Sequence, residues 1–273
     1  MNILEKIMAK KNERLKQLQE TIPFSQIIKR WEDEHQSFPH PSRGFSLTPD
    51  RFHVIAEVKK ASPSKGQIPW ALSLEDLVHQ YEISGASLIS VLTEEDFFLG
   101  SPTLFQTIRQ MTTLPLLRKD FIFTEYQLYE SALLGADVIL LITSLLEDQK
   151  LNLLMDLAKQ LGLRPLVECR DEKEIMRALQ AGATFLGINN RDLRTFEIDL
   201  KRTEKLCRLI PNDCFIVSES GILQPSDAAL VSQFGANAIL VGESCVRSSQ
   251  PGKHIRALLK AGQVQKDRSS LRL

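Results

Sequence analysis

The chain has 273 residues, of which 43% are hydrophobic and 25% are charged. This is the composition of an ordinary globular protein with a large buried core. Lysine and arginine together number 34, as do aspartate and glutamate, so the net charge favours neither a nucleic acid nor an anionic membrane as a partner. The sequence contains no run of about 18 apolar residues, and we therefore expect no membrane-spanning helix.

The N-terminal segment has charged residues at helical spacing and predicts two helices, at roughly residues 2–20 and 23–35, with Pro23 at the start of the second. It lacks the apolar core and cleavage site of a secretory signal. We interpret residues 1–48 as a helical extension, which either caps the following domain as a solvated element or covers a pocket. The four cysteines show no CxxC spacing, so we expect reduced, mostly buried thiols in a cytoplasmic protein.

A Gly-Ala pair followed by a short apolar run recurs about every 50 residues. The four copies are SGASLISVLT, LGADVILLIT, AGATFLGINN and FGANAILVGES, with their glycines at Gly85, Gly135, Gly182 and Gly235. One strand-helix unit of a barrel takes roughly 25–30 residues, so each interval holds about two units. Four double units predict eight strands.

The other four strands lie between these copies. They are the short apolar runs HVIAEVK near residue 53, LPLLRKD near 114, RPLVEC near 164 and CFIVSES near 214. Apolar strands that alternate with amphipathic helices indicate a parallel sheet covered by helices. We therefore predict that residues 49–273 form a (β/α)8 TIM barrel, in one domain with the extension. A doubly wound open sheet is the alternative, but no GxGxxG follows the first strand.

Charged residues occupy the carboxyl ends of several predicted strands, where barrel enzymes carry their chemistry. Side chains two residues apart share a face of a strand, so if Ile55, Leu117 and Leu166 point inward, the polar residues in phase with them do too. Applied to five strands, this rule places inside the barrel Glu57, Lys59, Lys119, Glu168, Asn189, Arg191 and Glu219. A single charged strand end is more often a solvated loop residue, but five together favour a site in which lysine acts as acid and glutamate as base.

Small residues follow the seventh and eighth strands, at Ser220-Gly221 and Gly242-Glu243. Loops at this position frequently bind a phosphate group through backbone N–H groups, although glycine also serves ordinary turns. The loop after the first strand, KKASPSKG, contains Ser62 and is either a mobile lid or a solvated turn. We find no spaced set of histidine and carboxylate ligands and predict no metal site.

In their order and spacing, the runs IAEVKKASPSKG, SVLTEEDFFLGS, LLRKDFI, PLVE, GINNRDL, VSESGI and LVGES resemble the successive strand ends of indole-3-glycerol-phosphate synthases. The resemblance extends from about residue 51 to residue 247, and the N-terminal helices resemble the extension of that family. It implies an enzyme of tryptophan biosynthesis that converts 1-(2-carboxyphenylamino)-1-deoxyribulose 5-phosphate into indole-3-glycerol phosphate, with release of CO2 and water. It also implies that the reaction needs no metal or organic cofactor.

The resemblance also implies roles for individual residues. Lys119 resembles the general acid of ring closure, and Glu168 resembles a base or a stabiliser of the cationic intermediate. Lys59, held by Glu57, resembles a contact of the substrate carboxylate that assists dehydration. The division of acid and base roles among Lys59, Lys119 and Glu168 is left open. The other matched positions are a catalytic carboxylate at Glu219, substrate contacts at Asn189, Arg191, Ser220, Phe98 and Ser62, and phosphate contacts at Gly221, Gly242 and the backbone of Glu243.

Two other functions are compatible with parts of this pattern. Another phosphate-binding barrel, such as a phosphoribosylanthranilate isomerase-like enzyme, shares the phosphate loops but accounts less well for the lysine-glutamate set. In a catalytically silent barrel, some of the charged residues at the strand ends would be replaced, but all of them are present here. We expect a small phosphorylated substrate, no nucleic-acid or membrane partner, and a monomer or weak homodimer.

Overall fold

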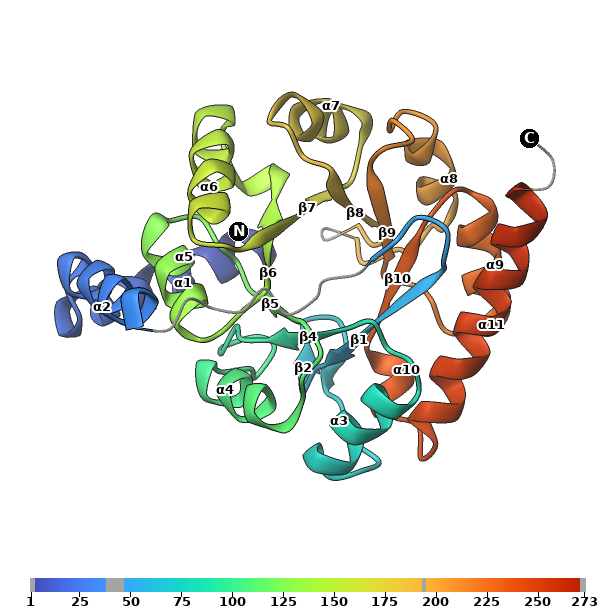
Figure 1. Cartoon of the computed structure of the whole chain (residues 1–273), viewed down its shortest axis with the longest axis horizontal. Coiled ribbons are helices and arrows are strands. Elements are labelled where there is room, and N and C mark those ends of the chain that lie inside the picture. The colour runs from blue at the N-terminus through green and yellow to red at the C-terminus, as the bar shows by residue number, and fades with distance from the viewer. Residues whose placement is uncertain (1–2, 38–46, 193–194, 271–273) are drawn as a thin grey trace.

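Eight parallel strands close into a barrel around the centre of the molecule (Figure 1). The computed structural model describes residues 3–37, 47–192 and 195–270, so part of the predicted extension 1–48 lies outside the described residues. Around the ring, β1 pairs with β4 on one side and with β10 on the other. The strands are β1 His53–Val58, β4 Leu88–Leu92, β5 Leu116–Lys119, β6 Val138–Ile142, β7 Arg164–Cys169, β8 Phe185–Asn189, β9 Phe215–Glu219 and β10 Ala238–Val241. This confirms the predicted (β/α)8 barrel and rules out the open sheet.

Helices alternate with the strands and surround the barrel (Figure 1). They are α3 Leu74–Ile83, α4 Pro102–Met111, α5 Glu125–Leu133, α6 Asp148–Gln160, α7 Glu172–Gln180, α8 Lys201–Cys207, α9 Pro225–Gln233, α10 Glu243–Val246 and α11 Pro251–Ser270. The side chains of Ser73, Ser101 and Asp171 cap three of them by accepting a backbone N–H bond. Among the helices of the described chain, none is long and apolar enough to cross a bilayer.

The recurring Gly-Ala pair has a structural cause. Each of its glycines follows a helix and has a positive φ, for example 87° at Gly85 and 77° at Gly135. This left-handed conformation ends the helix and is one that glycine adopts without steric cost. The alanine and the apolar run then lead into the next strand. The repeat therefore marks the turns at the amino ends of alternate strands.

Side chains alternate between the two faces of the barrel wall, as predicted. Ile55, Leu117 and Leu166 belong to an apolar cluster to which all eight strands contribute, so this cluster fills the barrel interior. Val54 precedes Ile55 on β1, and Val167 follows Leu166 on β7. Both valines pack in clusters between the strands and the helices. Alternate residues of these strands thus point into the barrel, as the period of two predicts.

Two helices, α1 Ile3–Thr21 and α2 Phe24–Ser37, precede the barrel. The α2 helix packs against α5 through aromatic contacts, including an edge-on contact of 5.7 Å between the ring centroids of Trp31 and Tyr129. The first turns of α1 reach the barrel interior, where Ile7 joins the apolar cluster of the strands. The extension therefore contributes to the barrel mouth as well as to its outer surface.

A buried ion pair anchors α1 to the barrel. The Lys11 ammonium is 2.8 Å from Oδ2 of Asp120 and 3.1 Å from Oε2 of Glu95. The same Asp120 carboxylate is 3.2 Å from the Arg118 guanidinium and accepts a 2.7 Å hydrogen bond from Thr93. Burial raises the pKa of Asp120, but the charges of Lys11 and Arg118 outweigh this effect and lower that pKa below its ordinary value. Asp120 is therefore a buried carboxylate that two cations compensate.

Lys11→Met should lower the free energy of unfolding by about 3 kcal/mol, because it takes one of the two cations away from a buried carboxylate. Chemical denaturation followed by circular dichroism measures the loss. Lys10→Met is the matched control, since Lys10 lies on the exposed side of the same helix and should leave the midpoint unchanged. An equal loss in the two variants would contradict the anchoring role of Lys11.

Candidate active site

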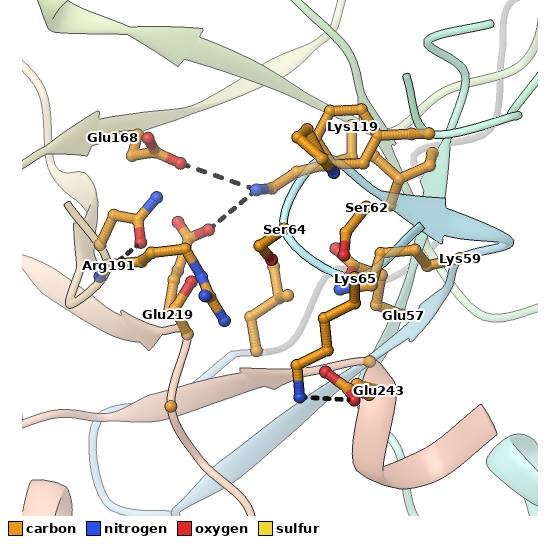
Figure 2. Close-up of a pocket in the computed structure, with 18 of the residues that line it drawn as sticks. Glu57, Lys59, Ser62, Ser64, Lys65, Lys119, Glu168, Arg191, Glu219 and Glu243 are labelled. Carbon is orange, nitrogen blue, oxygen red and sulfur yellow. Dashed lines mark hydrogen bonds and ion pairs between the residues drawn. The ribbon is translucent and has the colours of Figure 1, made fainter. Parts of the chain in front are cut away.

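A cavity of about 230 Å³ opens at the carboxyl ends of the strands. All thirteen residues predicted from the sequence as catalytic, substrate-binding or phosphate-binding border it: Glu57, Lys59, Ser62, Phe98, Lys119, Glu168, Asn189, Arg191, Glu219, Ser220, Gly221, Gly242 and Glu243. They come from strands or loops all round the ring, which brings residues far apart in the sequence to one place (Figure 2).

Lys119 lies at the centre of this group. Its ammonium, at the end of β5, is 3.0 Å from Oε2 of Glu219 and 3.6 Å from Oε2 of Glu168 (Figure 2). Burial lowers the pKa of Lys119, but the charges of Glu219 and Glu168 outweigh burial and raise that pKa above its ordinary value. The lysine is therefore held in its protonated form at the cavity wall.

Glu219 lies at the end of β9 and is only 2% exposed. Burial raises its pKa to about 7, although the charge of Lys119 acts in the opposite direction and Glu168 adds to the increase. Neither of its carboxylate oxygens accepts a hydrogen bond from the residues that the structure describes, and Lys119 contacts this carboxylate as an ion pair. Glu219 can therefore take up or release a proton near neutral pH.

A second ion pair joins Glu57 and Lys59 at the end of β1. The Lys59 ammonium is 2.8 Å from Oε1 of Glu57, and the Ser90 hydroxyl donates to Oε2 of the same carboxylate at 3.5 Å. The backbone here is held by Trp70, whose indole N–H donates to the Lys59 carbonyl at 2.8 Å. A Cβ on Gly242 would lie 2.5 Å from Oε1 of Glu57, so the bare glycine leaves room for this carboxylate.

The two glycine turns lie side by side on the cavity rim. Ser220 and Gly221 have φ values of 66° and 85°, which turns the chain sharply after β9. Gly242 is the N-cap of the short helix α10, whose first N–H groups have no acceptor within the helix. The Ser244 hydroxyl is buried and makes no hydrogen bond among the described residues. These groups offer uncompensated donors to an anion.

Asn189 is the last residue of β8, and Arg191 follows two residues later. The backbone N–H of Arg191 donates to the Asn189 side-chain oxygen at 3.0 Å, and the Arg191 guanidinium donates to the Phe196 carbonyl at 3.3 Å. Across the cavity, the buried Glu94 carboxylate accepts N–H bonds from the loop after β4, including that of Phe98 at 2.9 Å. Phe98 thereby forms part of an apolar wall.

Two groups that line the cavity were not among the predicted site residues. The first turns of α1 contribute Ile3, Leu4 and Ile7, more than 45 residues before the first strand. The loop after β1 forms a small hairpin, β2 Ala61–Ser62 and β3 Gly66–Gln67, and its Lys65 ammonium is 2.9 Å from Oε1 of Glu243. Only Lys65 carried a signal, because its loop followed a predicted strand end.

Within the described ranges, no group of three or more histidine, cysteine, aspartate or glutamate side chains is arranged to hold a metal ion. All four cysteines are free thiols, and Cys169, Cys214 and Cys245 are buried. Burial raises the pKa of Cys245 to about 12, so this thiol stays protonated at neutral pH. None of the cysteines lines the cavity.

Sequence comparisons with known proteins find one enzyme family. A sequence model of the indole-3-glycerol phosphate synthase family matches residues 4–258. The chain is similar to the indole-3-glycerol phosphate synthase of Caldanaerobacter subterraneus subsp. tengcongensis, with 43% identity over 248 residues that cover 91% of this chain and 94% of that protein. The enzyme of the same name from Acetivibrio thermocellus is 50% identical over 203 residues, 74% of this chain and 78% of that protein.

Among solved structures, the thiamine phosphate pyrophosphorylase of Pyrococcus furiosus is similar in fold. Its TM-score is 0.60 at 15% sequence identity, and the match covers 80% of this chain and 98% of that one. At this identity the likeness concerns the barrel fold alone.

The pKa of about 7 at Glu219 predicts a pH-dependent stability. Because this pKa exceeds the ordinary value of 4.5, the stabilisation by the protonated carboxyl is complete below about pH 4.5 and is lost as the pH rises to about 7. Glu219→Gln cannot ionise and should be more stable than the parent protein above about pH 8, by roughly 3 kcal/mol. Denaturation curves across this range measure the difference, which should shrink toward zero near pH 4.5. A difference independent of pH would refute the raised pKa.

Proposed function

Because the chain belongs to the indole-3-glycerol phosphate synthase family, we propose that the cavity of charged strand ends is where it closes the indole ring. The enzyme is a carboxy-lyase of tryptophan biosynthesis, and it converts 1-(2-carboxyphenylamino)-1-deoxyribulose 5-phosphate into indole-3-glycerol phosphate with loss of CO2 and water. The observation that carries the proposal is the convergence of Lys59, Lys119 and Glu168 on one small cavity.

In the proposed first step, Lys119 acts as the general acid. The ketone oxygen of the substrate takes the proton of the Lys119 ammonium while the aromatic carbon that carries the carboxylate bonds to the ketone carbon. The ammonium is kept charged by Glu219 and Glu168, so it is available as a donor at neutral pH. The positive charge that develops on the anilino nitrogen is stabilised by the nearby Glu168 carboxylate.

Decarboxylation and dehydration complete the reaction. Loss of CO2 returns the bonding electrons to the ring and removes the positive charge on nitrogen. Departure of the new hydroxyl as water needs a proton donor on one side and a base on the other. We propose that Lys59, held by Glu57 at 2.8 Å, donates this proton, and that Glu168 or Glu219 accepts the proton lost from the ring system. The pKa of about 7 suits Glu219 to that exchange.

The rest of the cavity binds the substrate. We propose that the phosphate group is held by backbone N–H groups of Gly221, Gly242 and Glu243, with the free Ser244 hydroxyl beside them. Asn189 and Arg191 would orient the departing carboxylate, Ser62 and Ser220 would contact the sugar chain, and Phe98 would face the aromatic ring. We also propose that the protein is cytoplasmic and is a monomer or weak homodimer. We propose no nucleic-acid or membrane partner.

Lys119→Met should lower kcat by at least about 10²-fold, because the variant lacks the proposed proton donor. Indole fluorescence, followed as the purified variant meets the carboxyphenylamino sugar phosphate, measures turnover. Lys205→Met is the control, since that side chain is 71% exposed on α8, away from the cavity, and should leave kcat unchanged. Near-normal turnover by a folded Lys119→Met variant would remove Lys119 from the acid role.

Inorganic phosphate should compete with the substrate, because the glycine turns would bind the free anion as they bind the substrate phosphate. The apparent KM should rise linearly with phosphate concentration while kcat stays constant. Chloride at equal ionic strength is the control and should have a smaller effect. If phosphate and chloride act alike, the turns do not form a phosphate site.

A further inference from the structure

Gly187 occupies the middle of the region where the two catalytic carboxylates meet. It lies on β8, between β7 and β9, and in the sheet register it is opposite Glu168 on one side and Val217 on the other. Glu219, two residues beyond Val217 on β9, must lean across β8 to bring its carboxylate to Lys119, which comes from β5. The path of that side chain therefore passes over Gly187.

The space above Gly187 is filled by the carboxylate itself. A Cβ built on Gly187 would lie 2.2 Å from Oε1 of Glu219 and 3.5 Å from Cδ1 of Leu166. The backbone at this position does not require glycine, because Gly187 is absent from the residues with positive φ. A glycine inside a strand weakens the strand and often marks a close approach by another group. Here the approaching group is a side chain of the same site.

We propose that Gly187 is a positioning residue, whose missing side chain lets Glu219 lie across β8 and reach Lys119. Only the expected effect on catalysis rests on the proposed function. The carboxylate oxygens of Glu219 accept no hydrogen bond from the described residues, so the walls of the site and the charge of Lys119 set the position of this carboxylate. Gly242 leaves room for Glu57 in the same way, with a Cβ distance of 2.5 Å.

Gly187→Ala would displace the Glu219 carboxylate from the ammonium of Lys119. We expect kcat to fall by about 10²-fold, as for a misplacement of about 1 Å, with a smaller change in KM. The pKa of Glu219 should also rise further, because Lys119 would no longer offset burial. The titration of Glu219 can be followed by NMR of carboxyl-labelled glutamate, in which Glu219→Gln identifies the signal.

A double-mutant cycle tests the steric claim without reference to activity. Gly187→Ala should lower the unfolding temperature of the parent protein by roughly 5 °C, as expected for overpacking. In a Glu219→Ala background the added methyl group meets no carboxylate, so the same substitution should cost little. Leu154→Ala is the control, because Leu154 of α6 is buried in the cluster between the strands and the helices, and its cost should be the same in both backgrounds.

The outcomes separate this inference from the proposed function. Stability coupling and a shifted titration, with normal turnover, would support the positioning role of Gly187 and count against a catalytic role of Glu219. An equal loss of stability in both backgrounds would overturn the inference, whatever happens to activity. If Gly187→Ala does not fold, the double variant decides: recovery of folding supports the inference, and failure overturns it.

Discussion

The ammonium of Lys119 is the charge on which the arrangement of the site depends. Its side chain is 14% exposed, so water compensates it only in part, and the carboxylates of Glu168 and Glu219 supply the rest. The three groups come from β5, β7 and β9, and their contact requires a closed ring in the correct register. The protonation state of Lys119 therefore depends on closure of the barrel. A shift of one residue in one of these strands would turn its charged side chain toward the helices.

The residue before Lys119 belongs to a different set of ion pairs. Arg118 precedes Lys119 on the same strand, so it points to the opposite face, where it is 1% exposed and bonds to Ser131 of α5 at 3.0 Å. Asp120, which also borders the cavity, and Lys11 complete this network. Two adjacent cations thus serve different purposes: one holds helices against the wall, and the other faces the substrate cavity.

Much of the fold and the site could be predicted because both follow from local periodicity. The Gly-Ala repeat marked the turns before alternate strands, and period two placed Glu57, Lys119 and Glu168 on the inner face. The contribution of α1 could not be predicted, because Lys11 belongs to a highly charged helix and looks like a surface residue until Asp120 is brought beside it. The role of Gly187 was hidden for a related reason, since a missing side chain acquires meaning only from what occupies its place.

The Gly-Ala turns lie at the amino ends of the strands, on the opposite side of the barrel from the cavity. In such a barrel, residues at the amino-end face serve mainly the stability of the fold, and residues at the carboxyl-end face determine the reaction. Substitutions at the amino-end face therefore change mainly the stability of the protein. Substitutions at the carboxyl-end face change its substrate selectivity and leave the barrel intact. Descendants of such a chain can therefore acquire a new reaction while keeping the same architecture.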